Sequence, residues 1–454
     1  MSRVIQVLSG VALAAAMTIA AHGQAAAPGR PVAYENARLI VGDGSAPIES
    51  GVMVVQGGRI TAVGAKGSVT VPAGAAHVDL TGRTVMPTLV NAHVHIGYEG
   101  YTSWGAKNYT PRNVLDHLRR EAYYGVAATQ SVGSSPTEAS IAFAHDQQAG
   151  KFPVASRFFF IPGMAPPNGG PDAILIKGTK ELNAVYEVST SAEARTAIAG
   201  MAAKGIKQVK IWVDDRRGTY PKMTPEVYNA VIDEAHRRGM LVHAHAIQMA
   251  DQKAVVRAGV DVLVHTVQNE PIDDELMGLL REKKPYWTTV IGLGDRSEAC
   301  GGDPFIDETY PEKALDDIRA KDCAPLPPTS ANRERILANN LPKYIASGAR
   351  LVLGTDAGID ARHAFGWADH HEMTRWVQSG VMPMEAIVAA TSRPAALIGI
   401  PDLGTLAAGK SADFLVLTAN PLEDIRNTRR IDKVYLAGVA LDRAKMAREF
   451  RGGN

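Results

Sequence analysis

Met86-Pro-Thr-Leu-Val-Asn-Ala-His-Val-His95 is a short apolar run that ends in two histidines. Successive side chains of a β-strand point to opposite faces, so His93 and His95 would share a face and could bind one ion. The pattern alone is weak, because histidines are also common as hydrogen-bonded core residues. Its position at the end of a buried strand favours a metal site.

The same layout recurs further along the chain. Other short apolar runs end in, or contain, residue types that can bind a metal ion or take part in catalysis: Lys210, His243, His245, His265 and Asp356. In a barrel of alternating strands and helices, all strands open at their carboxyl ends onto one face. We therefore expect these residues to converge there, since five separate strands would otherwise have to place them alike by chance.

Alternating strand-like and helix-like segments define the predicted fold. Apolar runs at 157–161, 208–213, 240–246, 261–266, 286–291 and 350–355 are separated by helix-patterned stretches with start signals at Thr110-Pro111, Ser191 and Thr224-Pro225. Eight such units fit between residues 86 and 400, which predicts the α/β class with a (β/α)8 TIM barrel. An open doubly wound sheet is the alternative, but its glycine-rich phosphate turn is not evident.

The two ends of the mature chain have a β-rich texture. Residues 26–85 and 401–454 both contain short β-rich runs punctuated by turn signals such as Gly57-Gly58 and Asn420-Pro421. Because chain ends tend to lie close together, we expect the two parts to form one small β-sandwich beside the barrel.

The N-terminus and the cysteines bear on localisation. Residues 1–25 combine Arg3, an apolar stretch and small residues, which predicts a signal peptide and an exported, periplasmic or secreted protein. A single-pass anchor is the alternative, although the apolar stretch is short for a bilayer, and no membrane contact is expected after signal removal. Cys300 and Cys323 could form a disulfide or remain two free thiols.

Composition narrows the class of partner. Lys and Arg number 48 against 47 Asp and Glu, and there is no basic run that would follow a phosphate backbone, so nucleic acid is not expected. A small molecule or short peptide is the expected substrate, and a homo-oligomer is compatible with the sequence.

Lys210 interrupts the apolar strand 208–213. A buried ammonium group is costly unless it is paired, so such a lysine is either ion-paired or functional. Local sequence favours an ion pair with Asp214 or Asp215. Burial would also favour the neutral amine, which can add carbon dioxide and become an anionic carbamate ligand.

Taken together, these motifs resemble those of the amidohydrolase superfamily, over nearly all of the mature chain. The resemblance rests on the strand-end residues above and on three segments: Gly354-Thr-Asp-Ala-Gly358, Ala390-Thr-Ser-Arg-Pro-Ala395 and Gly404-Thr-Leu-Ala-Ala-Gly-Lys-Ser-Ala-Asp413. The prolidase, ochratoxinase and imidazolonepropionase branch is the most similar. Thr88 and Asn91 depart from the pattern, because the family usually has Gly and Asp at these positions.

The resemblance implies a ligand set and a reaction. Two divalent ions, usually Zn²⁺, would share a carbamylated Lys210, with His93, His95 and Asp356 on one ion and His243 and His265 on the other. A metal-bound hydroxide would cleave amide C–N bonds of dipeptides or N-acyl amino acids, with Asp356 as general base and acid. His243 is favoured over His245 because it stands where the family's ligand ends the strand.

Substrate contacts are less constrained. His245, Tyr98 and Arg216 are the candidates, since Arg216 could bind a carboxylate through two hydrogen bonds. The alternatives are a solvated loop for Arg216 and simple loop packing for Tyr98. We expect His363, His370 and His371 on the surface or anchoring loops.

Two alternative functions remain open. One is a mononuclear, imidazolonepropionase-like cyclic amidohydrolase, and the other is a non-catalytic metal-stabilised binding protein, against which Asp356 argues.

Overall fold

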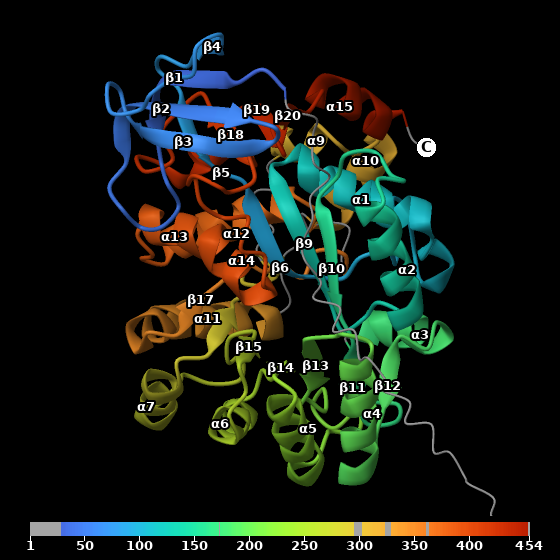
Figure 1. Cartoon of the computed structure of the whole chain (residues 1–454). Helices are drawn as coiled ribbons and strands as arrows, with labels where there is room; N and C mark the ends of the chain where they lie inside the picture. Colours follow the sequence, from blue (N-terminus) through green and yellow to red (C-terminus); the bar gives the residue numbers. More distant parts are fainter. Residues whose placement is uncertain (1–28, 172, 295–301, 323–327, 360–362, 453–454) are drawn as a thin grey trace, which may run out of the picture.

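The computed structural model describes residues 29–171, 173–294, 302–322, 328–359 and 363–452. The predicted signal segment 1–25 and both cysteines, Cys300 and Cys323, lie outside these residues. Within the described part, a small sheet domain sits beside a larger barrel (Figure 1).

Eight parallel strand positions form the barrel. They are β6(Leu89–Val94), β9(Val126–Val132), β10(Arg157–Ile161) continued by β11(Gly163–Ala165), β13(Gln208–Trp212), β14(Leu241–His245), β15(Val262–Val264), β16(Tyr286–Thr288) and β17(Arg350–Leu351). Pro162 separates β10, which pairs with β9, from β11, which pairs with β13, so one bent strand joins two sheets. The Ala92 N–H donates to Leu353 O and the His95 N–H to Ala357 O, both at 2.8 Å, which closes the ring. The predicted (β/α)8 barrel is confirmed.

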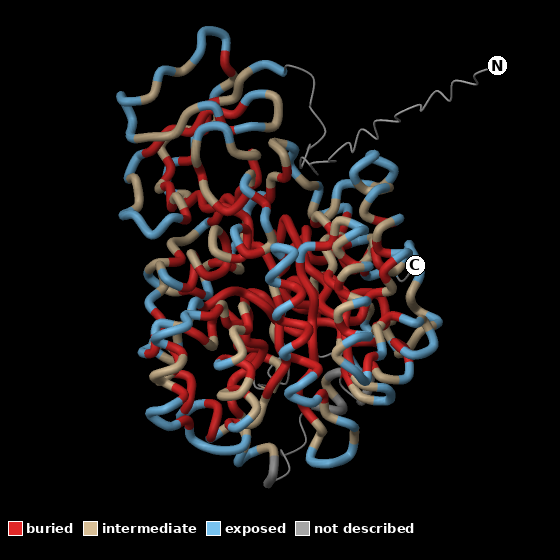
Figure 2. The backbone as a smooth tube through the Cα atoms, turned by 60° about the horizontal axis from the view of Figure 1, so that its bottom comes forward, coloured by how far each residue is buried: buried red, intermediate tan, exposed pale blue. Residues whose placement is uncertain are grey.

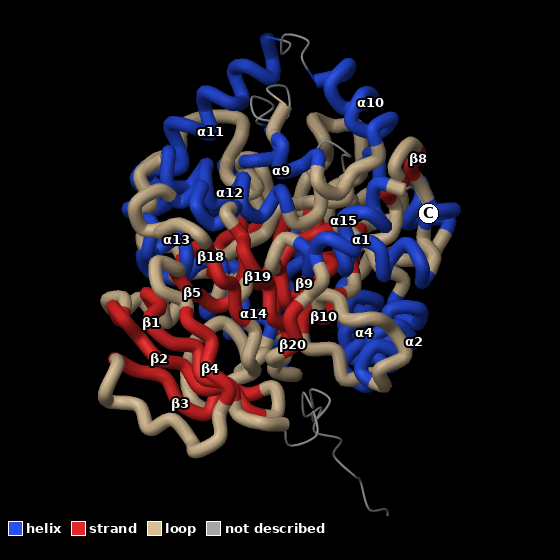
Figure 3. Tube along the Cα trace, turned by 90° about the horizontal axis from the view of Figure 1, so that it is seen from above, coloured by secondary structure: helices blue, strands red, loops and turns tan. Residues whose placement is uncertain are grey.

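Helices pack on the outside of these strands, and Figure 3 shows α1 and α2 on the side of β9 and β10. The helices are α1(Pro111–Tyr123), α2(Thr137–Gln148), α3(Ala173–Glu181), α4(Ser191–Ala203), α5(Pro225–Arg237), α6(Met249–Ala258), α7(Asp274–Lys283), α9(Pro304–Asp307), α10(Glu312–Asp322), α11(Pro328–Ser347), α12(Trp367–Gln378), α13(Pro383–Ala390), α14(Ser392–Ile398) and α15(Arg443–Arg451). Short 3₁₀ turns are η1(Ala106–Asn108), η2(Gly292–Gly294) and η3(Ile425–Arg429), and minor strands are β7(Glu99–Gly100), β8(Ser103–Trp104) and β12(Val185–Glu187).

The predicted start signals mark the beginnings of three helices, but only the first caps its helix as expected. Thr110 accepts a hydrogen bond from Asn113 N–H at 3.2 Å and caps α1. At α4 the cap is Thr190, one residue before the expected Ser191, and it forms a reciprocal capping box with Glu193. Thr224 precedes α5 without a side-chain cap bond, so Pro225 at the first helical position is the effective signal there.

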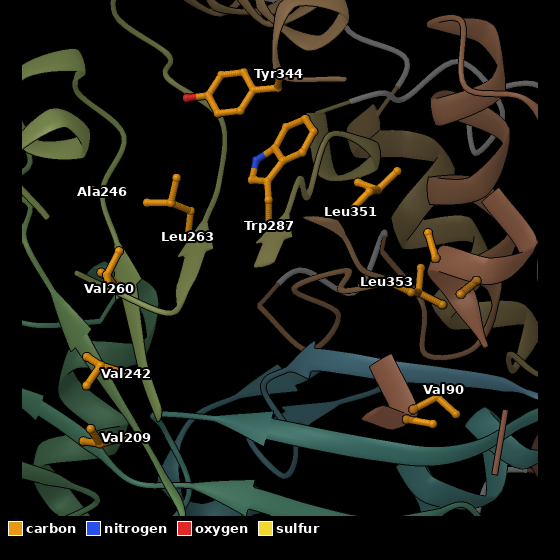
Figure 4. Close-up of a cluster of buried hydrophobic side chains, with 14 of the residues drawn as sticks. Val90, Val209, Val242, Ala246, Val260, Leu263, Trp287, Tyr344, Leu351 and Leu353 are labelled. Carbon is orange, nitrogen blue, oxygen red and sulfur yellow. The ribbon is translucent and has the colours of Figure 1, made fainter. Parts of the chain in front are cut away.

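The barrel core lies between the strands and the helices. Buried residues run through the central strands in Figure 2, and Figure 4 shows Val209, Val242, Leu263 and Trp287 within one apolar cluster. This packing fixes the strand positions and therefore the geometry of the residues at their carboxyl ends.

The sheet domain combines both ends of the described chain. Its strands are β1(Val32–Leu39), β2(Ile48–Gln56), β3(Arg59–Ala65), β4(Ala76–Asp79), β5(Thr84–Pro87), β18(Phe414–Leu417), β19(Ile431–Leu436) and β20(Val439–Ala440). Antiparallel pairing of β5 with β18 joins the two ends, and the hydrogen-bonded order is β20-β19-β18-β5-β1-β2-β3, with β4 on β1. The small sheet domain built from both termini is thereby confirmed.

Membrane-spanning character is absent from the described helices: none is both long and apolar enough to cross a bilayer.

Candidate metal centre

Three predicted ligands meet at the carboxyl ends of β6 and β17. His93 Nε2 lies 2.8 Å and His95 Nε2 lies 3.0 Å from Asp356 Oδ1. His265, which follows β15, places its Nε2 3.7 Å from Asp356 Oδ2. All four side chains are buried. The structure therefore brings together His93, His95, His265 and Asp356 from three separate strands, as the sequence predicted.

These donors fit a divalent cation. Ligand atoms held about 2.0–2.2 Å from one zinc ion lie roughly 3 to 3.5 Å apart, close to the separations observed here. His93 Nε2 and Asp356 Oδ1 are near each other, yet neither makes a properly aligned hydrogen bond within the described residues. Buried polar atoms that converge without such bonds are the expected geometry of a coordination site.

Burial keeps the imidazoles in the form that binds metals. It lowers the pKa of His93 to about 3, with a further contribution from the positive charge of Lys210. Burial also lowers the pKa of His265 well below its usual value. Burial alone would raise the pKa of Asp356, but His93, His95 and His265 together hold it well below its usual range. At neutral pH the site thus offers neutral imidazoles and a carboxylate, which are the ligand forms.

Two of these residues adopt a left-handed backbone. His265 has φ 74° and Asp356 has φ 60°, a region that side chains other than glycine rarely occupy. Such conformations cost about 1–3 kcal/mol each and persist where the surrounding structure holds them. Both strained residues belong to the cluster, and backbone strain of this kind is typical of functional sites.

Lys210 and the two histidines of β14 lie beside the cluster. Lys210 pairs in register with His243, and Trp212 pairs with His245, so His245 lies one step nearer the mouth of the barrel. Gly133 makes room for the lysine stem: with φ 81°, its added Cβ would meet Lys210 Cγ at 2.8 Å. Asp214 pairs with Arg216 and His245, and Asp215 pairs with Lys222.

The two β14 histidines have different neighbours. His243 Nε2 lies 2.8 Å from Gln208 Oε1, whereas the His245 ring lies 4.5 Å from the His265 ring, measured between centroids. His245 Nε2 also lies 3.1 Å from Asp214 Oδ2. His243 therefore lies beside Lys210, whereas His245 lies beside His265, nearer the mouth of the barrel.

His95 is oriented by a residue that the sequence did not single out. Ser134 Oγ lies 2.8 Å from His95 Nδ1, and Tyr98 donates its hydroxyl to Ser134 O at 2.5 Å. A partner on the second ring nitrogen fixes the orientation of a ligating histidine. The available signal was the polar run Gln130-Ser-Val-Gly-Ser-Ser135, which ends the apolar strand β9.

Tyr98 was predicted either to contact the substrate or to pack its loop onto the barrel. Its side chain is fully buried, and its hydroxyl donates to Ser134 O. Its ring packs against Tyr109 at 5.4 Å between centroids. These contacts favour the loop-packing alternative and connect Tyr98 to His95 through Ser134.

Asn91 links the two strands that bear the cluster. Its Oδ1 accepts the His93 N–H at 2.9 Å, and its Nδ2 donates to Thr355 Oγ1 at 3.0 Å. Thr355 Oγ1 also accepts the Ala357 N–H at 3.1 Å. One amide thereby positions the backbones on either side of the His93–Asp356 contact.

Arg216 lies at the rim of the cluster, after β13. Its Nη1 pairs with Asp214 and lies 2.6 Å from His245 Nε2. Arg216 and Arg217 have φ of 49° and 61°, so both lie in a strained turn, and the Arg216 guanidinium reaches His245. The solvated-loop alternative does not describe Arg216, which is partly buried against Asp214 and His245.

The histidines after β17 are not on the surface. His363, His370 and His371 are all buried. His370 Nδ1 contacts Thr428 Oγ1 at 2.9 Å and its Nε2 contacts Tyr124 O at 2.8 Å, which fits the anchoring role expected for this group. The expectation of surface exposure is wrong because α12, which carries His370 and His371, packs between the barrel and the sheet domain.

Comparison with known proteins agrees with this architecture. The family model described as "Amidohydrolase family" matches residues 84–441, a range that covers the barrel, the predicted ligands and the C-terminal strands β18, β19 and β20. The chain belongs to the amidohydrolase family.

Individual relatives cover different shares of this amidohydrolase. An ochratoxinase of Aspergillus niger is 26% identical over 246 residues, 52% of this chain and 45% of the relative, so the match spans less than half of that protein. An imidazolonepropionase of Deinococcus radiodurans is 33% identical over 103 residues, 22% of this chain and 25% of the relative. A structure of a Xaa-Pro dipeptidase with bound methionine has a TM-score of 0.72 at 25% identity and covers 90% of this chain and 99% of that chain.

Proposed function

We propose that this protein is an exported, binuclear metal-dependent hydrolase of amide C–N bonds, acting on dipeptides or N-acyl amino acids. One observation carries the proposal. His93, His95 and Asp356 lie at the carboxyl ends of barrel strands, and one ligand atom from each lies within 4.8 Å of the other two. Active sites of this fold lie at that face.

The ligand assignment extends the observed cluster. His93, His95 and Asp356 would hold one ion; His243 and His265 would hold the other, and carbamylated Lys210 would serve both. Zinc suits this mixture of imidazole and carboxylate donors. Bound ions of this kind supply a water of lowered pKa and polarise the amide carbonyl.

Asp356 is the proton carrier in this proposal. The three histidines around it keep it a carboxylate at neutral pH, so it can take a proton from the attacking water. Protonated Asp356 would then give that proton to the nitrogen of the leaving amine. The balance of the step is one water consumed, one C–N bond broken, and one carboxylic acid and one amine formed.

Arg216 is the proposed determinant for a substrate carboxylate. A guanidinium group presents its N–H donors in a planar fork that matches the two oxygens of a carboxylate. The same choice of substrate is supported by the similarity in structure to a dipeptidase. Export rests on the N-terminal sequence pattern alone.

A mononuclear enzyme for cyclic amides is the second candidate. The compact donor group of His93, His95 and Asp356 would suffice for a single ion. The segment shared with an imidazolonepropionase also favours it. Zinc content separates the two, because the first proposal expects two ions per chain and the second expects one.

The test combines metal analysis with an activity screen. The zinc-loaded chain would be offered dipeptides, N-acyl amino acids, their C-terminal amides and lactams, and the released amine would be measured. We expect two zinc ions per chain and turnover of carboxylate substrates in preference to the matched amides. Arg216→Gln should raise KM for the carboxylates only. An inert zinc-replete preparation across the panel would instead favour a non-catalytic binding protein.

A further inference from the structure

Two buried carboxyl groups lie behind the metal centre, and the proposed reaction does not use them. Glu121 is on α1 and Asp369 is on α12, and both side chains are fully buried. The end of α1 meets α12, where His370 Nε2 lies 2.8 Å from Tyr124 O, and the two carboxyl groups interact with each other.

The described part of the chain offers these two carboxyl groups few hydrogen-bond donors. None of their four oxygens has a hydrogen-bond donor in good geometry, although the Asn91 amide and the Gly366 N–H lie close enough to act on them. The other charged group that acts on Asp369 is Glu372, one turn along α12 and of the same sign. Glu372 has its own donors, since the N–H groups of Ile291 and Gly292 reach it at 3.0 and 2.6 Å.

Two carboxylates cannot both stay charged in such a place. Burial removes their hydration, and like charges in contact repel each other. Burial, with the nearby negative groups, raises the pKa of Asp369 to about 8, and burial and Asp369 raise the pKa of Glu121 well above its usual value. The pair titrates as a unit, so the proton belongs to both residues.

The pair also contacts the residue that links the strands of the site. Asn91 acts on Asp369 from one side and binds the His93 N–H and Thr355 Oγ1 on the other. Asn91 thus connects the acid pair to the backbones that place His93 and Asp356.

We propose that Glu121 and Asp369 form a carboxylic acid–carboxylate pair that shares one proton at neutral pH and positions Asn91 behind the metal centre. Both are positioning residues, since neither touches the predicted ligands directly. The shared proton supplies the donor that the four oxygens otherwise lack, and it leaves one negative charge for the Asn91 amide to stabilise.

The proposal has a definite sign in the pH dependence of stability. Unfolded Glu and Asp lose their protons near pH 4, whereas burial raises the pKa of both Glu121 and Asp369, so the folded pair still holds a proton at neutral pH. The pair's contribution to the free energy of unfolding is therefore greatest below about pH 4 and decreases as the pH rises from there. One retained proton makes the unfolding constant rise about tenfold per pH unit. The buried histidines of lowered pKa make stability depend on pH only below about pH 6.5, where unfolded histidine binds a proton. Measurements above pH 7 therefore report mainly on the acid pair.

The test is denaturant unfolding of the zinc-loaded full chain between pH 7 and 8.5. Asp369→Asn and Glu121→Gln supply an amide N–H in place of the shared proton, so each should lose the pH slope and gain stability relative to wild type as pH rises. Glu423→Gln, at an exposed glutamate, is the matched control and should keep the wild-type slope. Equal slopes in wild type and both amide variants would overturn the proposal.

Two further readouts do not depend on folding equilibria or on catalysis. Infrared spectra of the wild type at neutral pH should show the carbonyl band of a protonated carboxylic acid, and the Glu121→Gln/Asp369→Asn double variant should lack it. Zinc affinity by chelator competition should fall about tenfold in Asp369→Ala and be retained in Asp369→Asn. An absent band in the wild type would refute the shared proton even if the hydrolase proposal holds. Equal zinc affinity in Asp369→Ala would refute the positioning role.

Discussion

The sheet domain and the mouth of the barrel are both buried, but they bury different chemistry. In the sheet domain Phe414 packs between Tyr34 and Tyr435, with ring centroids 5.1 and 4.3 Å away, inside an apolar cluster. At the barrel mouth the buried groups are imidazoles and a carboxylate, and His93 Nε2 and Asp356 Oδ1 lie 2.8 Å apart without an aligned hydrogen bond. The first arrangement stabilises the fold, whereas the second costs stability unless an ion compensates. Substitutions should therefore separate the two regions by what they impair.

The largest expected effect is on turnover, at the barrel mouth. Asp356→Asn should lower kcat about 10³-fold or more, because the amide cannot accept the proton of the attacking water. Zinc content should remain largely unchanged. Asp413→Asn is the matched control: Asp413 is equally buried but pairs with Arg157 at 2.9 and 3.1 Å, so it should lose stability and keep kcat. Unchanged kcat in Asp356→Asn would reject the catalytic assignment.

The sheet domain should respond in the opposite way. Phe414→Ala should lower the free energy of unfolding by about 3–5 kcal/mol, because it removes a large buried ring and leaves a cavity. The kcat per folded molecule should be unchanged below the unfolding transition. Denaturant unfolding combined with active-site titration measures both quantities. A large loss of kcat in the folded fraction would show that the sheet domain contributes to the site.

An intermediate effect is expected where a polar support meets the cluster. Ser134→Ala removes the partner of His95 Nδ1 and should weaken zinc binding about 10- to 100-fold, measured by chelator competition. Ser135→Ala is the control, since its hydroxyl contacts Ser131 Oγ at 2.7 Å instead of a predicted ligand. If both variants lose the same affinity, the effect is general packing and not orientation of His95.

The smallest effect compares two helix starts that look alike in sequence. Thr110→Ala should cost about 1 kcal/mol, because Thr110 caps α1 through Asn113 N–H. Thr224→Ala should cost much less, because Thr224 makes no cap bond at α5. Thermal unfolding of the two variants tests the difference; equal losses would show that the cap geometry does not control α1.

The fold was largely predictable because its signals are local. Short apolar runs and helix-start residues follow from strand and helix periodicity, and they located β13, β14 and β15 within a residue or two. The bend at Pro162, which divides one barrel strand between two sheets, was not predictable, because it depends on which neighbours each half meets.

The site was predictable in its ligands but not in their supports. His93, His95, His265 and Asp356 each end an apolar run, and the barrel places such ends together. Ser134, Tyr98 and the Glu121–Asp369 pair carry no comparable signal, because a polar residue inside a helix or after a strand is usually exposed. Their importance follows only from burial and from the contacts that burial imposes.

The sequence by itself determined the succession of strands and helices and the residues that could bind metal, since both depend on residue type and spacing. Only the tertiary structure decided that Tyr98 supports Ser134, that His243 and His245 face different neighbours, and that two acids meet behind Asn91. The physical reason is that these contacts join residues about 20 to about 250 positions apart in the sequence, and their energies depend on the dielectric environment and geometry that packing creates.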